Sequence, residues 1–76
     1  MTLETFKEIY SQPKYTVNNL VDKMVETADL YATAKYHKAE AQSPENYDYY
    51  RREADHMFKR LCWLADKIKE KIANGD

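Results

Sequence analysis

The sequence predicts an all-α protein: an antiparallel hairpin of two long helices, preceded by a short N-terminal helix. The chain holds one glycine and two prolines in 76 residues, so long stretches lack helix breakers. Apolar residues recur at alternating spacings of three and four, which is typical of amphipathic helices that pack against a neighbour. Pro13 and Pro44 divide the chain into three such segments.

The first segment predicts a short helix over residues 3–10. Its apolar side chains include Leu3, Phe6 and Ile9, and Thr2 stands before them as an N-cap. Residues that precede a proline avoid the helical region, so this helix ends before Pro13. Two turns of helix are not stable alone, and we therefore expect this helix to dock on the rest of the chain.

We expect the second helix over residues 16–42. Its predicted core stripe consists of Val17, Leu20, Val21, Met24, Ala28 and Tyr31. Beyond Tyr31 the stripe weakens, because Lys35, Lys38 and Ala39 take over its face. The core is therefore expected to be thinner towards the C-terminal end of this helix.

The third helix is predicted over residues 44–73. Its boundary signals are Ser43 as N-cap, Pro44 in the first position, Glu45 beside the helix dipole, and Asn74-Gly75 as a stop. Its core stripe is Tyr47, Tyr50, Ala54, Met57, Leu61, Leu64 and Ile68. A junction of one or two residues between two helices of similar length makes them antiparallel.

The length allows one domain, residues 1–76, with a small core. Two helices that bury one face each leave other faces open, so we expect oligomerisation, as a homodimer, to complete a four-helix bundle. Cys62 is the only cysteine, which excludes an intrachain disulfide and is typical of a reducing compartment. The sequence shows no signal-peptide pattern and no apolar run of bilayer length, so we predict a cytoplasmic protein.

The charge balance argues against nucleic acid and anionic membranes as partners. The chain carries 12 basic and 13 acidic residues, for a net charge of −1, so it has no strong global field. Residues 44–73 hold seven Lys and Arg against six Asp and Glu, which is no basic footprint. A nucleic-acid-binding helical protein is therefore only the second alternative function.

Trp63 is the most unusual feature of the third helix. At about 100° per residue it projects roughly 150° away from the middle of the core stripe, towards solvent or towards something outside this chain. It belongs to an outer stripe at spacings of three and four: Tyr49, Arg52, His56, Arg60, Trp63 and Lys67. Trp, Tyr and Arg are enriched at the energetic centres of interfaces, so this stripe is our candidate partner-binding face.

Three occupants of the outer stripe are open: a second copy of the chain, the N-terminal helix, and a foreign protein. The N-terminal helix is long enough to reach the level of Trp63. We expect it, however, to dock in the groove beside the core stripe and not over the outer stripe.

The tip of the hairpin is rich in tyrosine and basic residues: Tyr36, Tyr47, Tyr49 and Tyr50, with Lys35, Lys38, Arg51 and Arg52. Phenol rings give contact area and a hydrogen bond at low entropic cost, which suits recognition. Tyr36 is therefore added to the partner-binding set. The alternative is that Tyr47 and Tyr50 are the last layers of the core, with hydroxyls that reach water.

A metal site is the first alternative function. Glu53 and His56 have the Glu-x-x-His spacing used by ferritin-like helix pairs, and the facing helix carries His37 and Glu40, with Glu26 further away. Two copies could assemble a carboxylate and histidine site across an interface. Against this, His56 lies well off the predicted core face, and such residues more often form a solvated face. We therefore expect no cofactor.

Other chemistry has no support in the sequence. Cys62 lacks a visible activating partner, and Gly75, the only glycine, cannot form a phosphate-binding loop. The chain is also too short to build an ordinary substrate pocket. We predict a non-enzymatic protein–protein interaction module: an adaptor, inhibitor or assembly factor, a type that includes small phage-encoded regulators.

Overall fold

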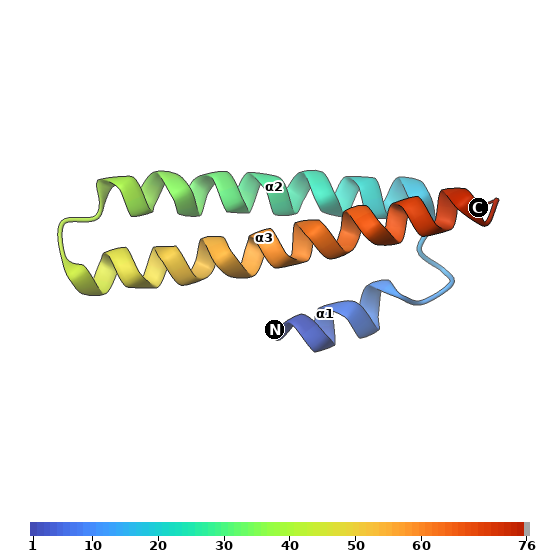
Figure 1. The fold of residues 1–76 in the computed structure, drawn as a ribbon, viewed down its shortest axis with the longest axis horizontal. Helices are drawn as coiled ribbons and strands as arrows, with labels where there is room; N and C mark the ends of the chain where they lie inside the picture. The colour runs from blue at the N-terminus through green and yellow to red at the C-terminus, as the bar shows by residue number, and fades with distance from the viewer. Residues whose placement is uncertain (76) are drawn as a thin grey trace.

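The structure is a computed structural model that describes residues 1–75. It contains three α-helices: α1 (Leu3–Tyr10), α2 (Val17–Glu40) and α3 (Pro44–Ala73). The helices α2 and α3 run antiparallel as a long hairpin, and α1 lies along one side of it, near the open end (Figure 1). The all-α fold, with a helical hairpin and a short N-terminal helix, is confirmed.

The molecule is a rod with extents of 48 × 19 × 15 Å. Its elongation follows from the length of α2 and α3, which lie side by side over most of the rod (Figure 1). None of the helices in the described part of the chain is both long enough and apolar enough to cross a bilayer.

Each helix begins at a hydroxyl side chain. Thr2, Thr16 and Ser43 are the N-caps, and each hydroxyl oxygen accepts a hydrogen bond of 3.2 Å from the backbone N–H three residues further on. At the start of α2 the pairing is reciprocal, because the Asn19 side chain accepts from the backbone N–H of Thr16 at 3.0 Å. These caps satisfy backbone donors that have no partner inside the helix.

The bounds of α1 and α3 agree with the sequence-based prediction, whereas α2 is shorter than the predicted 16–42. Its last helical residue is Glu40, and Ala41 is already extended, with φ −63° and ψ 134°. Ser43, which directly precedes Pro44, is also extended, with φ −128° and ψ 151°, because a residue before proline avoids the helical region. At the other end of α3, Gly75 takes φ +80°, a left-handed conformation that glycine adopts without strain.

The core is concentrated where all three helices meet. Phe6 of α1, Leu20 of α2 and Leu64 of α3 form one buried cluster. Towards the tip of the hairpin the buried positions hold smaller or unbranched side chains, Ala34, Ala54 and Met57. The core is therefore three layers thick at the open end and two layers thick at the tip.

The core stripe of α2 differs from the predicted one. Val21 and Ala28, both predicted in the core, are exposed, whereas Thr27 and Ala34 are buried. Thr27 can be buried because its hydroxyl donates a 2.7 Å hydrogen bond to the carbonyl oxygen of Lys23, one turn earlier. With that group satisfied, its methyl group packs as an apolar surface.

This revised stripe can be tested by one substitution at two positions of α2. Thr27→Asp places a charge in the core, and we expect it to lower the free energy of unfolding by more than about 3 kcal/mol. Thr33→Asp, the same change at an exposed position, should alter it by less than about 0.5 kcal/mol. Urea unfolding followed by circular dichroism measures both. Equal losses for the two variants would contradict the observed orientation of α2.

Candidate functional site

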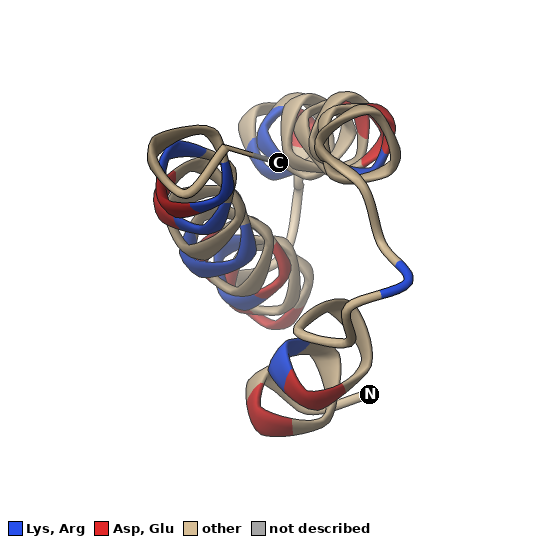
Figure 2. Ribbon diagram, turned by 90° about the vertical axis from the view of Figure 1, so that its right-hand side faces the viewer, with Lys and Arg blue, Asp and Glu red and all other residues tan. Residues whose placement is uncertain are grey.

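The helix α1 docks over Trp63 and in the groove beside it. The Phe6 ring meets the Trp63 ring edge-on, with the centroids 6.0 Å apart and an interplanar angle of 76°, and Phe6 also packs against Leu20 and Leu64. The view along the rod shows α1 on one side of the hairpin, closer to α3 than to α2 (Figure 2). Trp63 is half-buried. Of the occupants left open for the outer stripe, the N-terminal helix is the one that contacts Trp63. The expectation that this helix docks beside the core stripe and not over the outer stripe is wrong, because Phe6 contacts Leu64 and Trp63 together.

Arg60 also holds α1 in place. Its guanidinium donates a 2.6 Å hydrogen bond to the backbone carbonyl of Met1 and lies 5.1 Å from the centre of the Phe6 ring, a cation–π contact. Its Nε atom is buried and has no hydrogen-bond partner among residues 1–75. Arg60 and Trp63, two members of the predicted partner-binding stripe, thus bind the chain's own N-terminal helix.

The C-terminal end of α1 is held against α2. The Lys23 ammonium lies 5.4 Å from the centre of the Tyr10 ring and donates a 3.1 Å hydrogen bond to Glu26. Burial lowers the pKa of Lys23, but hydrogen bonds with Glu26 and Tyr10 outweigh this effect and raise the pKa above its ordinary value. Lys23 is therefore protonated at neutral pH and links α1 to α2 as a charged group.

The other residues of the outer stripe do not form one free surface. Lys67 lies 3.5 Å from Glu70, and Arg52 is bound to Asp48. His56 lines a hollow beside the first residues of the chain. Tyr49 remains exposed at the tip end. The stripe is thus divided: α1 and the residue before its cap contact Trp63 and Arg60, whereas Tyr49 and Arg52 stay exposed.

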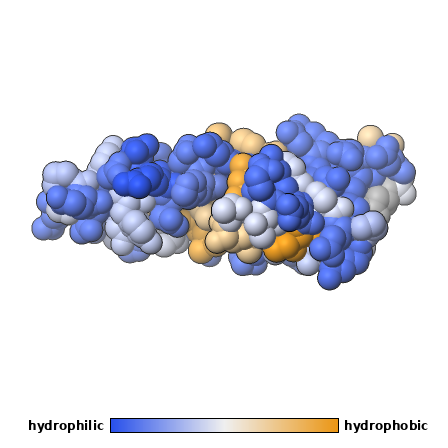
Figure 3. Space-filling view, turned by 90° about the horizontal axis from the view of Figure 1, so that it is seen from below, coloured by the Kyte–Doolittle hydropathy of each residue, from blue (hydrophilic) through white to orange (hydrophobic). Residues whose placement is uncertain are grey.

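Beyond the N-terminal end of α1, an apolar groove runs between α2 and α3 on the same side of the hairpin. We call it the α1-side groove; it is lined by Leu30, Thr33, Ala34, His37, Tyr49, Tyr50, Glu53 and Met57 and has a volume of about 200 Å³. Ala34 and Met57 form its buried floor, and Leu30 is an exposed wall. Apolar side chains on this face gather near the middle of the rod, while both ends are mostly hydrophilic (Figure 3).

A chain of aromatic rings borders this groove at the tip. The ring of His37 stacks on Tyr50, with centroids 5.1 Å apart and planes at 29°. Tyr36 meets His37 edge-on at 5.7 Å, and Tyr49 meets Tyr50 edge-on at 5.1 Å. Tyr50 is half-buried while Tyr36, Tyr47 and Tyr49 are exposed. Only Tyr50 therefore acts as a last core layer, and the other phenol rings are available for contact.

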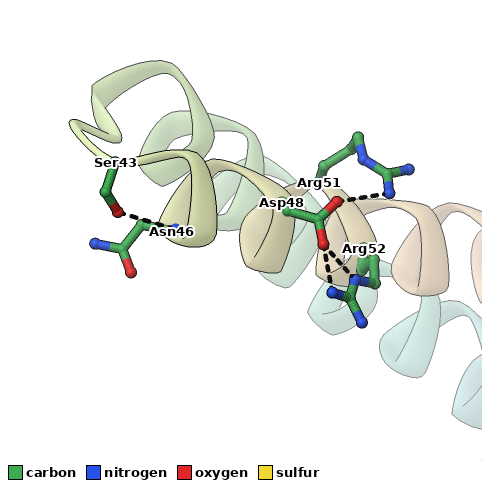
Figure 4. A network of polar contacts seen from close by, with 5 residues as sticks. All are labelled: Ser43, Asn46, Asp48, Arg51 and Arg52. Atoms are coloured by element: carbon green, nitrogen blue, oxygen red, sulfur yellow. Dashed lines mark hydrogen bonds and ion pairs between the residues drawn. The ribbon is translucent and has the colours of Figure 1, made fainter.

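The basic residues of the tip are partly neutralised by one carboxylate. Asp48 accepts a 2.8 Å hydrogen bond from Arg51 and is also bound by Arg52, whose Nε lies at 2.8 Å (Figure 4). The hydrogen bonds from Arg51 and then Arg52 hold the pKa of Asp48 below its usual range. The bond with Asp48 likewise raises the pKa of Arg51. The tip is therefore less basic than its four Lys and Arg residues indicate.

The metal-ligand candidates are spread over different parts of the rod. Glu53 and His37 line the α1-side groove, but His56 lines the hollow beside the chain start, and Glu26 lines another near the open end. Glu40 is exposed at the end of α2. Within residues 1–75, no three His, Cys, Asp or Glu side chains are close enough to hold a metal ion. A site built from two copies of the chain stays a prediction.

The sequence reasoning missed the groove-lining residues of α2. Leu30, Thr33 and His37 follow one another at spacings of three and four on the side of α2 next to the core stripe. An exposed leucine on the same side of α2 as Thr33 and His37 indicates a second contact face. On α3, Met57 was predicted in the core and is buried there, and it also forms the groove floor.

The docking of α1 predicts a specific effect of Phe6→Ala. Removing this buried ring should destabilise the protein by about 3 kcal/mol and release α1 from Trp63. The Trp63 emission should then shift to longer wavelength and become more accessible to acrylamide. Glu8→Ala, at an exposed position of α1, is the control and should change neither property. A Trp63 spectrum that is the same in Phe6→Ala and wild type would contradict this docking.

The tip network predicts a pH effect with a defined sign. Because the pKa of Asp48 is lowered in the folded protein, its ion pairs add stability above the unfolded pKa of about 3.9 and lose it as the pH falls through the folded value. Asp48→Asn should lower the melting temperature slightly at pH 7, and the difference should vanish in strong acid and in high salt. NMR titration of the Asp48 carboxyl in Arg51→Gln/Arg52→Gln should give a higher pKa than in wild type. An unchanged pKa would refute the network.

Comparisons with protein-family models, with curated proteins and with solved structures find no match to this chain. No function can therefore be transferred from a relative. Two sides of the hairpin are open among residues 1–75: the α1-side groove with its tyrosine border, and the side opposite α1.

Proposed function

We propose that this protein is a non-enzymatic interaction module that binds a helical segment of a partner protein in the α1-side groove. One observation carries the proposal. Part of the trough between α2 and α3 is filled by the chain's own short helix, and the adjoining part is open and apolar. Laying an amphipathic helix into an apolar groove is a common mode of peptide recognition.

The helix α1 indicates what kind of segment fits. It has only eight residues and binds by placing one aromatic ring, Phe6, into the trough. A partner helix of similar type would place one large apolar side chain between Leu30 and Met57. Burying such a side chain in a pocket typically supplies most of the affinity of a small interface.

The tyrosine side chains at the border of the groove can add specificity to the apolar binding. Tyr49 and Tyr36 are exposed, and their rings are held by neighbouring rings, so little rotamer freedom remains to be lost on binding. Their hydroxyls can each make a hydrogen bond to a partner. Arg52 and His56 lie further along α3 and would contribute to the rim of the interface.

Such a module acts by occupying a surface of its partner. We therefore place this protein among adaptors, inhibitors or assembly factors that work in the cytoplasm, where the lone thiol of Cys62 is stable. Small phage-encoded regulators are one type of such proteins.

The groove can be tested by photo-crosslinking from two matched positions. Tyr49, 57% exposed at the groove, and Phe58, 52% exposed and pointing away from it, are each replaced by a photoreactive phenylalanine. In a lysate of the source cells, the Tyr49 position should give a discrete adduct with another protein, and the Phe58 position should not give that adduct.

Leu30→Asp provides the second arm of this experiment. It removes an apolar wall and adds a charge, and should weaken the Tyr49 adduct at least about tenfold. Since Leu30 is exposed, the melting temperature should stay within about 2 °C of wild type. An adduct that survives Leu30→Asp, or one that forms equally from both positions, would refute the groove as the binding site.

A further inference from the structure

A second apolar stripe runs along α2 beside the core stripe. It follows spacings of four and three through Val21, Val25, Ala28, Ala32, Lys35 and Ala39, all of which are exposed and all but Lys35 apolar. At about 100° per residue its centre lies roughly 100° from the direction of the core, on the side away from the α1-side groove. Regular apolar spacing of this kind is typical of a helix that packs against another helix.

The neighbouring helix extends this stripe into a face. On α3, Phe58 and Cys62 are exposed and Ala65 is half-buried on the same side, and the Phe58 ring lies 6.0 Å from Tyr31 of α2. We call this surface the uncovered face; its apolar members are Val21, Val25, Ala28, Ala32, Phe58, Cys62 and Ala65. In the view along the rod, no element of residues 1–75 covers this side (Figure 2).

The exposed area of the chain is large for its mass. One copy exposes 5375 Å², whereas a compact monomer of 9.0 kDa is expected to expose about 4,900 Å². The stripe from Val21 to Ala39 extends about 27 Å along α2, so on a rod 15 to 19 Å wide the face has an area on the order of 450 Å², close to the excess exposed area of one copy. If a partner buried the uncovered face, the exposed area of the chain would therefore fall to the value expected for a compact protein of its mass.

We infer that a second copy of this chain packs on the uncovered face and completes a four-helix bundle, with α1 of each copy on the outside. The face suits a two-fold interface, because Ala28 and Ala32 near its centre let two backbones approach closely while Val25 and Phe58 fill the space beside them. It lies opposite the α1-side groove, so each copy of the dimer keeps that groove open. The inference is therefore independent of the proposed function.

The charges of the face indicate how the two copies are oriented. Lys35, Lys38 and Arg51 outnumber Asp55 around one hollow at its tip end, so this end is net basic although Asp48 partly neutralises Arg51. A parallel arrangement would bring the basic ends of both copies together, which costs free energy. An antiparallel arrangement places the basic ends at opposite ends of the bundle and leaves the apolar centres in contact.

The test compares two substitutions on opposite sides of α2. Val25, 63% exposed on the uncovered face, and Leu30, 51% exposed at the groove, are each changed to Asp, and solution mass is measured by sedimentation equilibrium. Wild type and Leu30→Asp should both sediment with twice the 9.0 kDa mass of one chain, whereas Val25→Asp should sediment as a single chain. A wild type that stays monomeric, or a Val25→Asp variant that stays dimeric, would overturn the inference.

Cys62 gives a second measurement that does not depend on a mutation. Its thiol is exposed in one copy and would be covered in the dimer, so alkylation by iodoacetamide should slow as the wild-type concentration rises. In Val25→Asp the rate should be fast and independent of concentration, and in Leu30→Asp it should behave as in wild type. A dimer whose Cys62 reacts at the monomer rate would use another face, and this would refute the inference while leaving the groove proposal intact.

Discussion

The tertiary structure depends on the burial of Phe6 between α2 and α3. A helix of eight residues has no stability of its own in water, so α1 exists because its one large buried ring joins Leu20 and Leu64. That ring in turn gives the hairpin its thickest core and contacts the Trp63 ring edge-on. Arg60 and Lys23 then hold the two ends of α1, one through the carbonyl of Met1 and the other beside Tyr10.

The reach of α1 determines what the rest of the rod can do. Because α1 spans only two turns, it fills the trough at the open end and stops before the tip. The tip half has no third layer, and its core is built from the small side chains of Ala34 and Ala54. Small residues leave room above them, so the trough continues as an open groove instead of closing over a filled core.

Local signals made the helices predictable, whereas the long-range contacts were not. Ser43 and Pro44 specify the start of α3 by hydrogen bonding and by a restricted φ, and both effects act within one turn. The position of α1 depends on the path of residues 11–16 and on the fit of Phe6 to a surface made by two other helices. Helical periodicity therefore gives the direction in which Trp63 projects from α3, but it does not identify the element that packs there.

Thr27 shows a second limit of pattern reasoning. Counting residue types treats threonine as polar, yet its hydroxyl is satisfied inside its own helix by the carbonyl of Lys23. Placing Thr27 outside the core merged two adjacent stripes of α2 into one, with Val21 and Ala28 assigned to the wrong set. The groove was missed for a related reason. Leu30 lies on the flank of α2 between the core stripe and the outer surface, and the periodicity of one helix does not show what a residue on its flank contacts.

The two open sides of the rod differ in chemistry, and this difference separates their roles. The α1-side groove is bordered by tyrosine and histidine rings with polar atoms, which can adapt to a foreign sequence. The uncovered face offers small aliphatic side chains in a regular spacing, which gain most from close packing against an equally regular surface. A second copy of the chain is the partner that supplies such a surface by symmetry, whereas the groove, which is neither flat nor regular, cannot pair with itself in the same way. Self-association and partner binding therefore fit different sides of the same hairpin.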